Sequence, residues 1–215
     1  MQSSVLYLEL GQYADELLKN QSDVLTPARK ELLLRLVDFI SRQLSEEGEV
    51  HLNFICTHNS RRSHISQLWA AAGAAHFGLA NVYTYSGGTE ATAFQPRAIA
   101  AMERAGFKIT TKDSSVDNPV YTVLFSDQQS GTKAWSKTFD DEANPKQQFA
   151  AVMTCSDADQ NCPFVPGTSL RLPLTFEDPK VADGTSFESV RYDQSVREIG
   201  KELLWVMREV ALRPF

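Results

Sequence analysis

The sequence predicts an α/β protein built on a parallel β-sheet. Short β-prone segments at residues 50–56, 82–85, 149–155 and 171–174 alternate with segments whose apolar residues repeat at helical spacing. Strands separated by helices in this way form a parallel sheet, because each helix returns the chain to the end where the previous strand began. The 215-residue chain has the apolar and charged content of an ordinary globular protein and shows no internal repeat.

Residues 1–48 precede the first strand and are predicted to form a helical extension. A short helix is expected at residues 13–18. Thr26 and Pro27 are typical of the start of a second helix, and Gly48 is typical of its end. Between them the apolar side chains fall on one helical stripe: Leu32, Leu33, Leu36, Val37, Ile40 and Leu44.

The remaining residues, 49–215, are predicted to form the main domain. Its helices are expected from Ser63 to Gly78, from Pro96 to Gly106 and over residues 189–212, with a turn at residues 86–90. An insertion at about 118–145 breaks the alternation and is predicted to be a β-hairpin, formed by residues 121–125 and 134–139 around a polar loop. We assign the aromatic side chains of the hairpin to packing in preference to a binding surface: Tyr121, Phe125, Trp135 and Phe139.

Composition argues against several classes of function. The formal net charge of −6 disfavours nucleic-acid and membrane-surface binding. No apolar run approaches the ~20 residues of a membrane span, and the N-terminus lacks the basic start of a signal peptide, so a cytoplasmic location is predicted. The three cysteines, Cys56, Cys155 and Cys162, are an odd number and lack zinc-site spacing, so neither a disulfide framework nor a metal site is expected.

The polar residues that follow the first strand are the best candidate for a reactive site. Cys56 ends the strand, and residues 57–63, here called the Cys56 loop, lead into the next helix. Ligands of α/β sheets bind beyond the carboxyl ends of the strands, where loop amides and the helix dipole attract oxyanions. The same dipole favours a thiolate, so Cys56 is a candidate nucleophile and Arg62 a candidate clamp on the oxyanion. Asp178, which precedes Pro179 in a late loop, is a candidate acid for the leaving oxygen.

These motifs, in this order, resemble the low-molecular-weight protein tyrosine phosphatase superfamily. The resemblance rests on Cys56 to Ser63 (C-x5-R-S), Ser86 to Thr89, Pro96 to Ala98, and Asp178-Pro179. The segment from Thr154 to Pro163 is similar to the redox-cysteine segment of the thioredoxin-coupled arsenate reductases in that superfamily. The likeness covers about residues 50–212, without the insertion. It implies a three-layer sandwich with a four-stranded parallel sheet, the phosphotyrosine protein phosphatase I-like fold.

The resemblance also implies a mechanism. Cys56 would attack arsenate held by the Cys56 loop, and Asp178 would protonate the departing oxygen. Cys155 would then displace arsenite and form a disulfide with Cys56, and Cys162 would resolve that disulfide. A thioredoxin-like reductant would serve as co-substrate, and no bound cofactor is expected. The oxyanion-binding residues would be Thr57, His58, Asn59, Ser60, Arg61, Arg62 and Ser63.

The sequence departs from the superfamily pattern in four places. His58 stands where glycine is usual, Arg61 where cysteine is frequent, and Gln67 where the reductases carry a glutamate linked to potassium binding. Lys180 follows the Asp-Pro pair, where the phosphatases commonly carry an aromatic residue. Three interpretations remain open: an arsenate reductase, a phosphatase acting on phosphotyrosine or another phosphomonoester, and a non-catalytic oxyanion-binding or redox-sensing protein.

Overall fold

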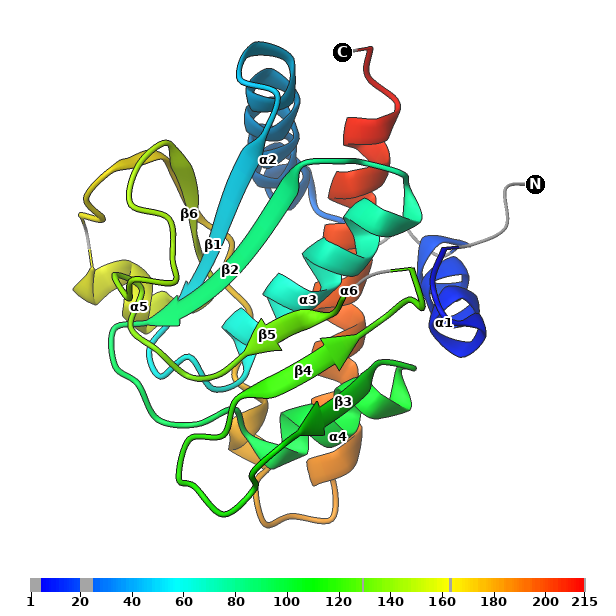
Figure 1. Cartoon of the computed structure of the whole chain (residues 1–215), viewed down its shortest axis with the longest axis vertical. Coiled ribbons are helices and arrows are strands. Elements are labelled where there is room, and N and C mark those ends of the chain that lie inside the picture. The colour runs from blue at the N-terminus through cyan, green and yellow to red at the C-terminus, as the bar shows by residue number, and fades with distance from the viewer. Residues whose placement is uncertain (1–4, 20–24, 129, 163, 215) are drawn as a thin grey trace.

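The structure, a computed structural model, describes residues 5–19, 25–128, 130–162 and 164–214. Figure 1 shows how its helices and strands are arranged. In chain order they are α1 (Leu8–Lys19), α2 (Pro27–Glu46), β1 (Val50–Cys56), α3 (Arg62–His76), β2 (Val82–Gly88), α4 (Pro96–Arg104), β3 (Lys108–Thr111), β4 (Tyr121–Leu124), β5 (Thr132–Ala134), β6 (Phe149–Met153), α5 (Ser156–Asn161), β7 (Thr168–Pro173), the 3₁₀ helix η1 (Pro179–Ala182) and α6 (Glu188–Ala211).

A four-stranded parallel sheet lies at the centre of the fold, with strand order β2-β1-β6-β7. This confirms the predicted α/β class and its four strands. Because all the strands run the same way, their carboxyl ends share one edge of the sheet. Cys56 is the last residue of β1, and Cys155 comes two residues after the end of β6.

Side chains alternate between the two faces of the sheet and contribute to two separate apolar clusters. Phe54 and Val152 belong to the main core, which contains α2, α3 and α6. Ile55 and Met153 point to the other face, where they pack with Ala158 of α5. The sheet is therefore flanked by helices, as predicted.

The N-terminal helices α1 and α2 pack against the long helix α6. Thr26 caps α2 as predicted, since its hydroxyl accepts from the amide of Arg29 at 3.2 Å. The Arg29 guanidinium donates to both carboxylate oxygens of Glu202 on α6, with the shortest distance at 2.7 Å. It also lies over the ring of Phe176, 4.8 Å from the ring centroid. The extension therefore contacts the segment that leads to Asp178.

The insertion contains the predicted hairpin within a larger second sheet. Its strands β4 and β5 pair with each other, and β4 also pairs with β3, which the sequence analysis did not predict. Strand β5 covers residues 132–134 and not the predicted 134–139. The aromatic side chains here are used for packing: Phe125 is buried, and the Tyr121 ring meets Phe94 edge-on at 5.8 Å.

Two predicted boundaries were wrong at the carboxyl edge of the sheet. Strand β2 continues through Ser86 to Gly88, where a turn was predicted, because these residues pair with the last residues of β1. A Cβ atom on Gly88 would lie 2.7 Å from the Asn59 nitrogen, so only glycine permits this close approach. Strand β6 stops at Met153, two residues early, because Cys155 caps the short helix α5.

Among the helices of the described residues, none combines the length and apolar character needed to cross a membrane.

Candidate active site

Cys56 is buried, and its sulfur lies 3.1 Å from the Ser63 hydroxyl. The same hydroxyl oxygen accepts from the side-chain amide of Asn59 at 2.8 Å. Because Asn59 occupies the acceptor side of Ser63, the hydroxyl proton is free to point at the sulfur and stabilise a thiolate. Asn59 has a φ of +43°, a left-handed conformation that asparagine tolerates better than most residues. These contacts fix the positions of the Cys56 sulfur, the Ser63 hydroxyl and the Asn59 side chain relative to one another.

The carbonyl groups of the Cys56 loop are held by neighbouring segments. The Thr57 carbonyl accepts from the Glu90 amide at 2.8 Å, and the Ser60 carbonyl from the Gln95 amide at 2.9 Å. The His58 carbonyl accepts from the hydroxyl groups of Thr92 and Ser136. Within the described residues, no acceptor takes a hydrogen bond from the amides of residues 57–62. A loop whose carbonyls are paired and whose amides are available is suited to bind an oxyanion.

Arg61 and Arg62 both reach Asp178. Arg62 donates to the Asp178 carboxylate at 2.7 Å and to the Phe176 carbonyl at 3.0 Å. The Arg61 Nε atom lies 2.9 Å from the other carboxylate oxygen. Burial acts to raise the pKa of Asp178, but Arg62, the Lys180 amide and Arg61 outweigh it, so the pKa lies below the ordinary aspartate value. The carboxyl group is therefore ionised in this arrangement.

Cys155 lies next to the Cys56 loop. Its sulfur is 3.4 Å from the Thr57 hydroxyl and is fully buried. Thr154 fixes this approach, because its amide and hydroxyl both donate to the Ile55 carbonyl, at 2.7 and 2.9 Å. Cys56 and Cys155 therefore lie at the adjacent carboxyl ends of the paired strands β1 and β6.

Cys162 belongs to the same buried cluster as Cys56 and Cys155, and all three are free thiols. It lies at the end of α5, where its thiol donates to the Phe164 carbonyl at 3.6 Å. Arg171 fixes the backbone here by donating to the Cys162 carbonyl. Burial raises the pKa of the Cys162 thiol, against the opposing charge of Arg171, so this thiol is held protonated.

Comparisons with known proteins show which family the chain resembles. The family described as low molecular weight phosphotyrosine protein phosphatase matches residues 51–122. An arsenate reductase of Bacillus licheniformis is 32% identical over 152 residues, which cover 70% of this chain and 89% of that protein. Arsenate reductase 1 of Staphylococcus saprophyticus is 32% identical over 64% of this chain and 85% of its own length.

The chain belongs to the low-molecular-weight phosphotyrosine protein phosphatase superfamily, together with these arsenate reductases. Both groups of relatives are enzymes. Among solved structures, a low-molecular-weight phosphotyrosine phosphatase of Vibrio cholerae aligns with a TM-score of 0.48 at 12% identity, over 74% of this chain and 94% of that one. A thioredoxin-dependent arsenate reductase of Corynebacterium glutamicum aligns with a TM-score of 0.41 at 18% identity, over 93% of this chain and 96% of that one.

Two departures from the superfamily pattern lie in the Cys56 loop and on the following helix α3. The His58 side chain is 42% exposed and lies 3.8 Å from the Glu90 carboxylate, at the rim of the loop. Gln67 is buried, and its amide nitrogen donates to the Thr84 carbonyl at 3.1 Å. In this superfamily member the described residues hold no group of three or more histidine, cysteine, aspartate or glutamate side chains placed to bind a metal.

Lys137, to which no sequence pattern pointed, supports the Cys56 loop from the insertion. Its amide donates to the Asn59 side-chain oxygen at 2.9 Å, and its carbonyl accepts from the Gly88 amide. The side chain is only 4% exposed, with its ammonium group 4.2 Å from the centre of the Trp135 ring. A lysine in a polar hairpin carries no sequence signal for such burial.

The buried ammonium group of Lys137 should make the stability of the protein depend on pH. Burial lowers its pKa to about 8, although Asp141 opposes the shift. Between pH 8 and the ordinary lysine value the unfolded chain binds more protons than the folded one, so stability should rise with pH in this window. Across this window we expect urea denaturation to show the wild type gaining about 3 kcal/mol of stability relative to Lys137→Met. If the free energy of unfolding changes with pH in the same way in both proteins, Lys137 does not cause the pH dependence.

Proposed function

We propose that the protein is an arsenate reductase that works through a relay of three cysteines. The observation that carries the proposal is the placement of Cys56, Cys155 and Cys162 as free thiols in one buried cluster, with Cys155 in contact with Thr57 of the Cys56 loop. The reacting unit would be residues 49–215, and residues 1–48 would support it.

In the first step the loop amides and Arg62 hold arsenate, and the Cys56 thiolate attacks arsenic. A sulfur–arsenic bond forms, and one oxygen departs as water. The bound oxyanion competes with Asp178 for Arg62. As Arg62 turns to arsenate, the pKa of Asp178 rises, and the carboxyl group can take up a proton and deliver it to the departing oxygen.

In the second step Cys155 attacks the Cys56 sulfur. A disulfide forms, the sulfur–arsenic bond breaks, and its electron pair leaves with arsenic as arsenite. Cys162 then attacks Cys155 and releases Cys56 as a thiolate. Cys155 and Cys162 cap the two ends of α5, so their Cα atoms are about 10 Å apart at ~1.5 Å of rise per residue. A disulfide spans at most about 7 Å between Cα atoms, so α5 must unwind in this step.

The relay ends with an oxidised Cys155–Cys162 pair, which requires an external dithiol for the next cycle. We propose a thioredoxin-like protein as this reductant. Three free cysteines suit a reducing compartment, so we place the protein in the cytoplasm.

A coupled assay tests the proposal. Purified protein is mixed with arsenate, thioredoxin, thioredoxin reductase and NADPH, and NADPH oxidation is followed. We expect turnover that depends on both arsenate and thioredoxin. Hydrolysis of an aryl phosphate without any arsenate-dependent oxidation of NADPH would refute the reductase proposal.

A phosphomonoesterase is the second candidate. Arg62 pairs with Asp178, and the Cys56 sulfur contacts Ser63, the residue that follows Arg62. With water, Cys56, Arg62 and Asp178 would suffice to form and hydrolyse a cysteinyl phosphate. This chemistry makes no use of Cys155 or Cys162, whose placement it leaves unexplained. The two candidates can be separated with variants of those two residues.

A further inference from the structure

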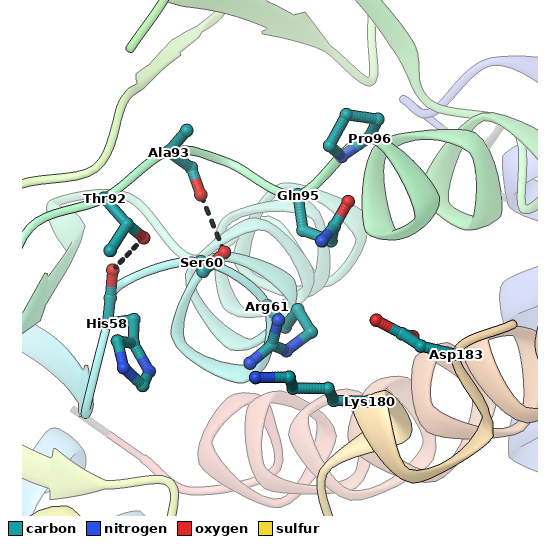
Figure 2. Close-up of a pocket in the computed structure, with 9 residues that line it drawn as sticks. All are labelled: His58, Ser60, Arg61, Thr92, Ala93, Gln95, Pro96, Lys180 and Asp183. Atoms are coloured by element: carbon teal, nitrogen blue, oxygen red, sulfur yellow. Dashed lines mark hydrogen bonds between the residues drawn. The ribbon is translucent and has the colours of Figure 1, made fainter. Parts of the chain in front are cut away.

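A pocket of about 410 Å³ adjoins the Cys56 loop. His58, Ser60 and Arg61 of the loop form one wall, and the segments 92–96 and 180–183 form the others (Figure 2). Inorganic arsenate is held by the loop itself and needs no neighbouring pocket of this size. The pocket is therefore not explained by the reductase activity.

Arg61 has hydrogen-bond donors that the protein does not use. Its residue is only 8% exposed, yet its Nε atom is buried without a hydrogen-bond partner, although it lies 2.9 Å from an Asp178 oxygen. Its Nη2 atom makes one long hydrogen bond to Asp178, at 3.3 Å. A guanidinium carries five N–H groups, and buried donors are normally paired. A ligand in the pocket cannot reach the buried Nε atom, but it can accept from the Nη groups, for which the described residues supply just this one long hydrogen bond.

Lys180 adds a second positive charge to this pocket. Figure 2 shows its ammonium end and the Arg61 guanidinium pointing into the same part of the pocket. In the described parts of the chain, no carboxylate forms an ion pair with the Lys180 ammonium group. The acid that lines the pocket, Asp183, is engaged elsewhere: it accepts from the Tyr192 hydroxyl at 2.9 Å and lies 4.0 Å from Arg97.

We propose that this pocket takes the organic group of a phosphomonoester bound in the Cys56 loop, and that Arg61 and Lys180 bind a carboxylate on that group. This deepens the phosphomonoesterase candidate above by naming its substrates, which would be acidic phosphomonoesters. A guanidinium fork and a mobile ammonium group are the donors that carboxylates prefer. The inference goes beyond arsenate reduction but rests on the same oxyanion loop.

The reaction requires only water as co-reactant. The Cys56 sulfur forms a bond to phosphorus while the ester P–O bond breaks, and the leaving oxygen takes up a proton from Asp178. Water then attacks phosphorus, the S–P bond breaks, inorganic phosphate is released and the thiol is regenerated. Arsenate reduction and ester hydrolysis would thus share Cys56 and differ in the need for Cys155 and Cys162.

Binding to the Cys56→Ser protein tests the proposal without turnover. Isothermal titration compares the 3- and 4-carboxyphenyl phosphates with the neutral carbamoylphenyl phosphates of the same shape. We expect the better carboxylate isomer to bind about tenfold more tightly than its carbamoyl counterpart. In the Cys56→Ser protein, a second substitution Lys180→Met should abolish most of this tenfold preference for the carboxylate, and Lys180→Glu should reverse the preference. Lys30→Met, an exposed lysine on α2, is the matched control and should leave the ratio unchanged.

The outcomes distinguish this proposal from the proposed function. Two results would overturn the pocket assignment: equal affinities for the carboxylate and carbamoyl esters, or a ratio of affinities that both Lys180 variants leave unchanged. If inorganic phosphate still binds, the proposed function is unaffected by either result. If inorganic phosphate does not bind either, the oxyanion loop itself is wrongly assigned, and the reductase proposal fails with it.

Discussion

Cys56→Ser is expected to lower both arsenate reduction and aryl phosphate hydrolysis by at least about a thousandfold. In the proposed mechanism both reactions begin with attack by the Cys56 sulfur. A serine hydroxyl at this position would have the Ser63 hydroxyl as its neighbour, which is not a base that could remove its proton. The comparison requires initial rates of the variant and the wild type in the two assays. The fold should survive, because the substitution changes one atom at the end of β1.

Two controls show whether the loss of activity in Cys56→Ser comes from the missing thiol or from a damaged fold. Circular dichroism and phosphate titration should show that Cys56→Ser is folded and still binds the oxyanion, since the loop amides and Arg62 are untouched. If the variant keeps wild-type activity in both assays, Cys56 is not the nucleophile. If it loses phosphate binding together with activity, the loss reflects damage to the loop and cannot be assigned to chemistry.

Cys162→Ser is expected to stop multiple-turnover arsenate reduction and leave aryl phosphate hydrolysis within about twofold of the wild type. Without Cys162 the Cys56–Cys155 disulfide has no internal thiol to resolve it, so each protein molecule should release one arsenite and then stall. The burst of arsenite, measured against protein concentration, gives the stoichiometry. Cys155→Ser should lack the burst as well, because arsenic then remains on Cys56.

Gln160→Ser provides the matched control, because Gln160 is an exposed residue of the same short helix. It should reduce arsenate at the wild-type rate. Continuous turnover by Cys162→Ser would mean that an external thiol resolves the first disulfide directly. An equal loss of both activities in Cys162→Ser would indicate that the substitution disturbs the buried cluster.

The sequence was informative about the site where its residues are close together along the chain. Cys56, Arg62 and Ser63 lie within eight residues where a clear strand leads into a clear helix, so their pattern could be recognised without a structure. The alternation of strands and helices likewise indicated the parallel sheet. Strand β3 was missed because it has only four residues, of which Ile109 alone is apolar, too few to show a period.

The contacts between distant segments could not be predicted. The Thr57 contact with Cys155 spans 98 residues, and the Asn59 contact with Lys137 spans 78. Nor does any sequence pattern indicate that Asp178 pairs with both arginines, since this depends on how the loop after β7 packs against α3. In the proposed mechanism these contacts are decisive, because one places the second thiol and another sets the resting charge of the proton donor.

The most direct test of the relay is to identify the disulfide that forms in Cys162→Ser. The reduced protein is treated with one equivalent of arsenate, remaining thiols are alkylated, and the peptides are analysed by mass spectrometry without reduction. The account predicts a disulfide between Cys56 and Cys155, formed only when arsenate is present. Alkylated Cys56 and Cys155 after arsenate treatment, with no disulfide between them, would contradict it.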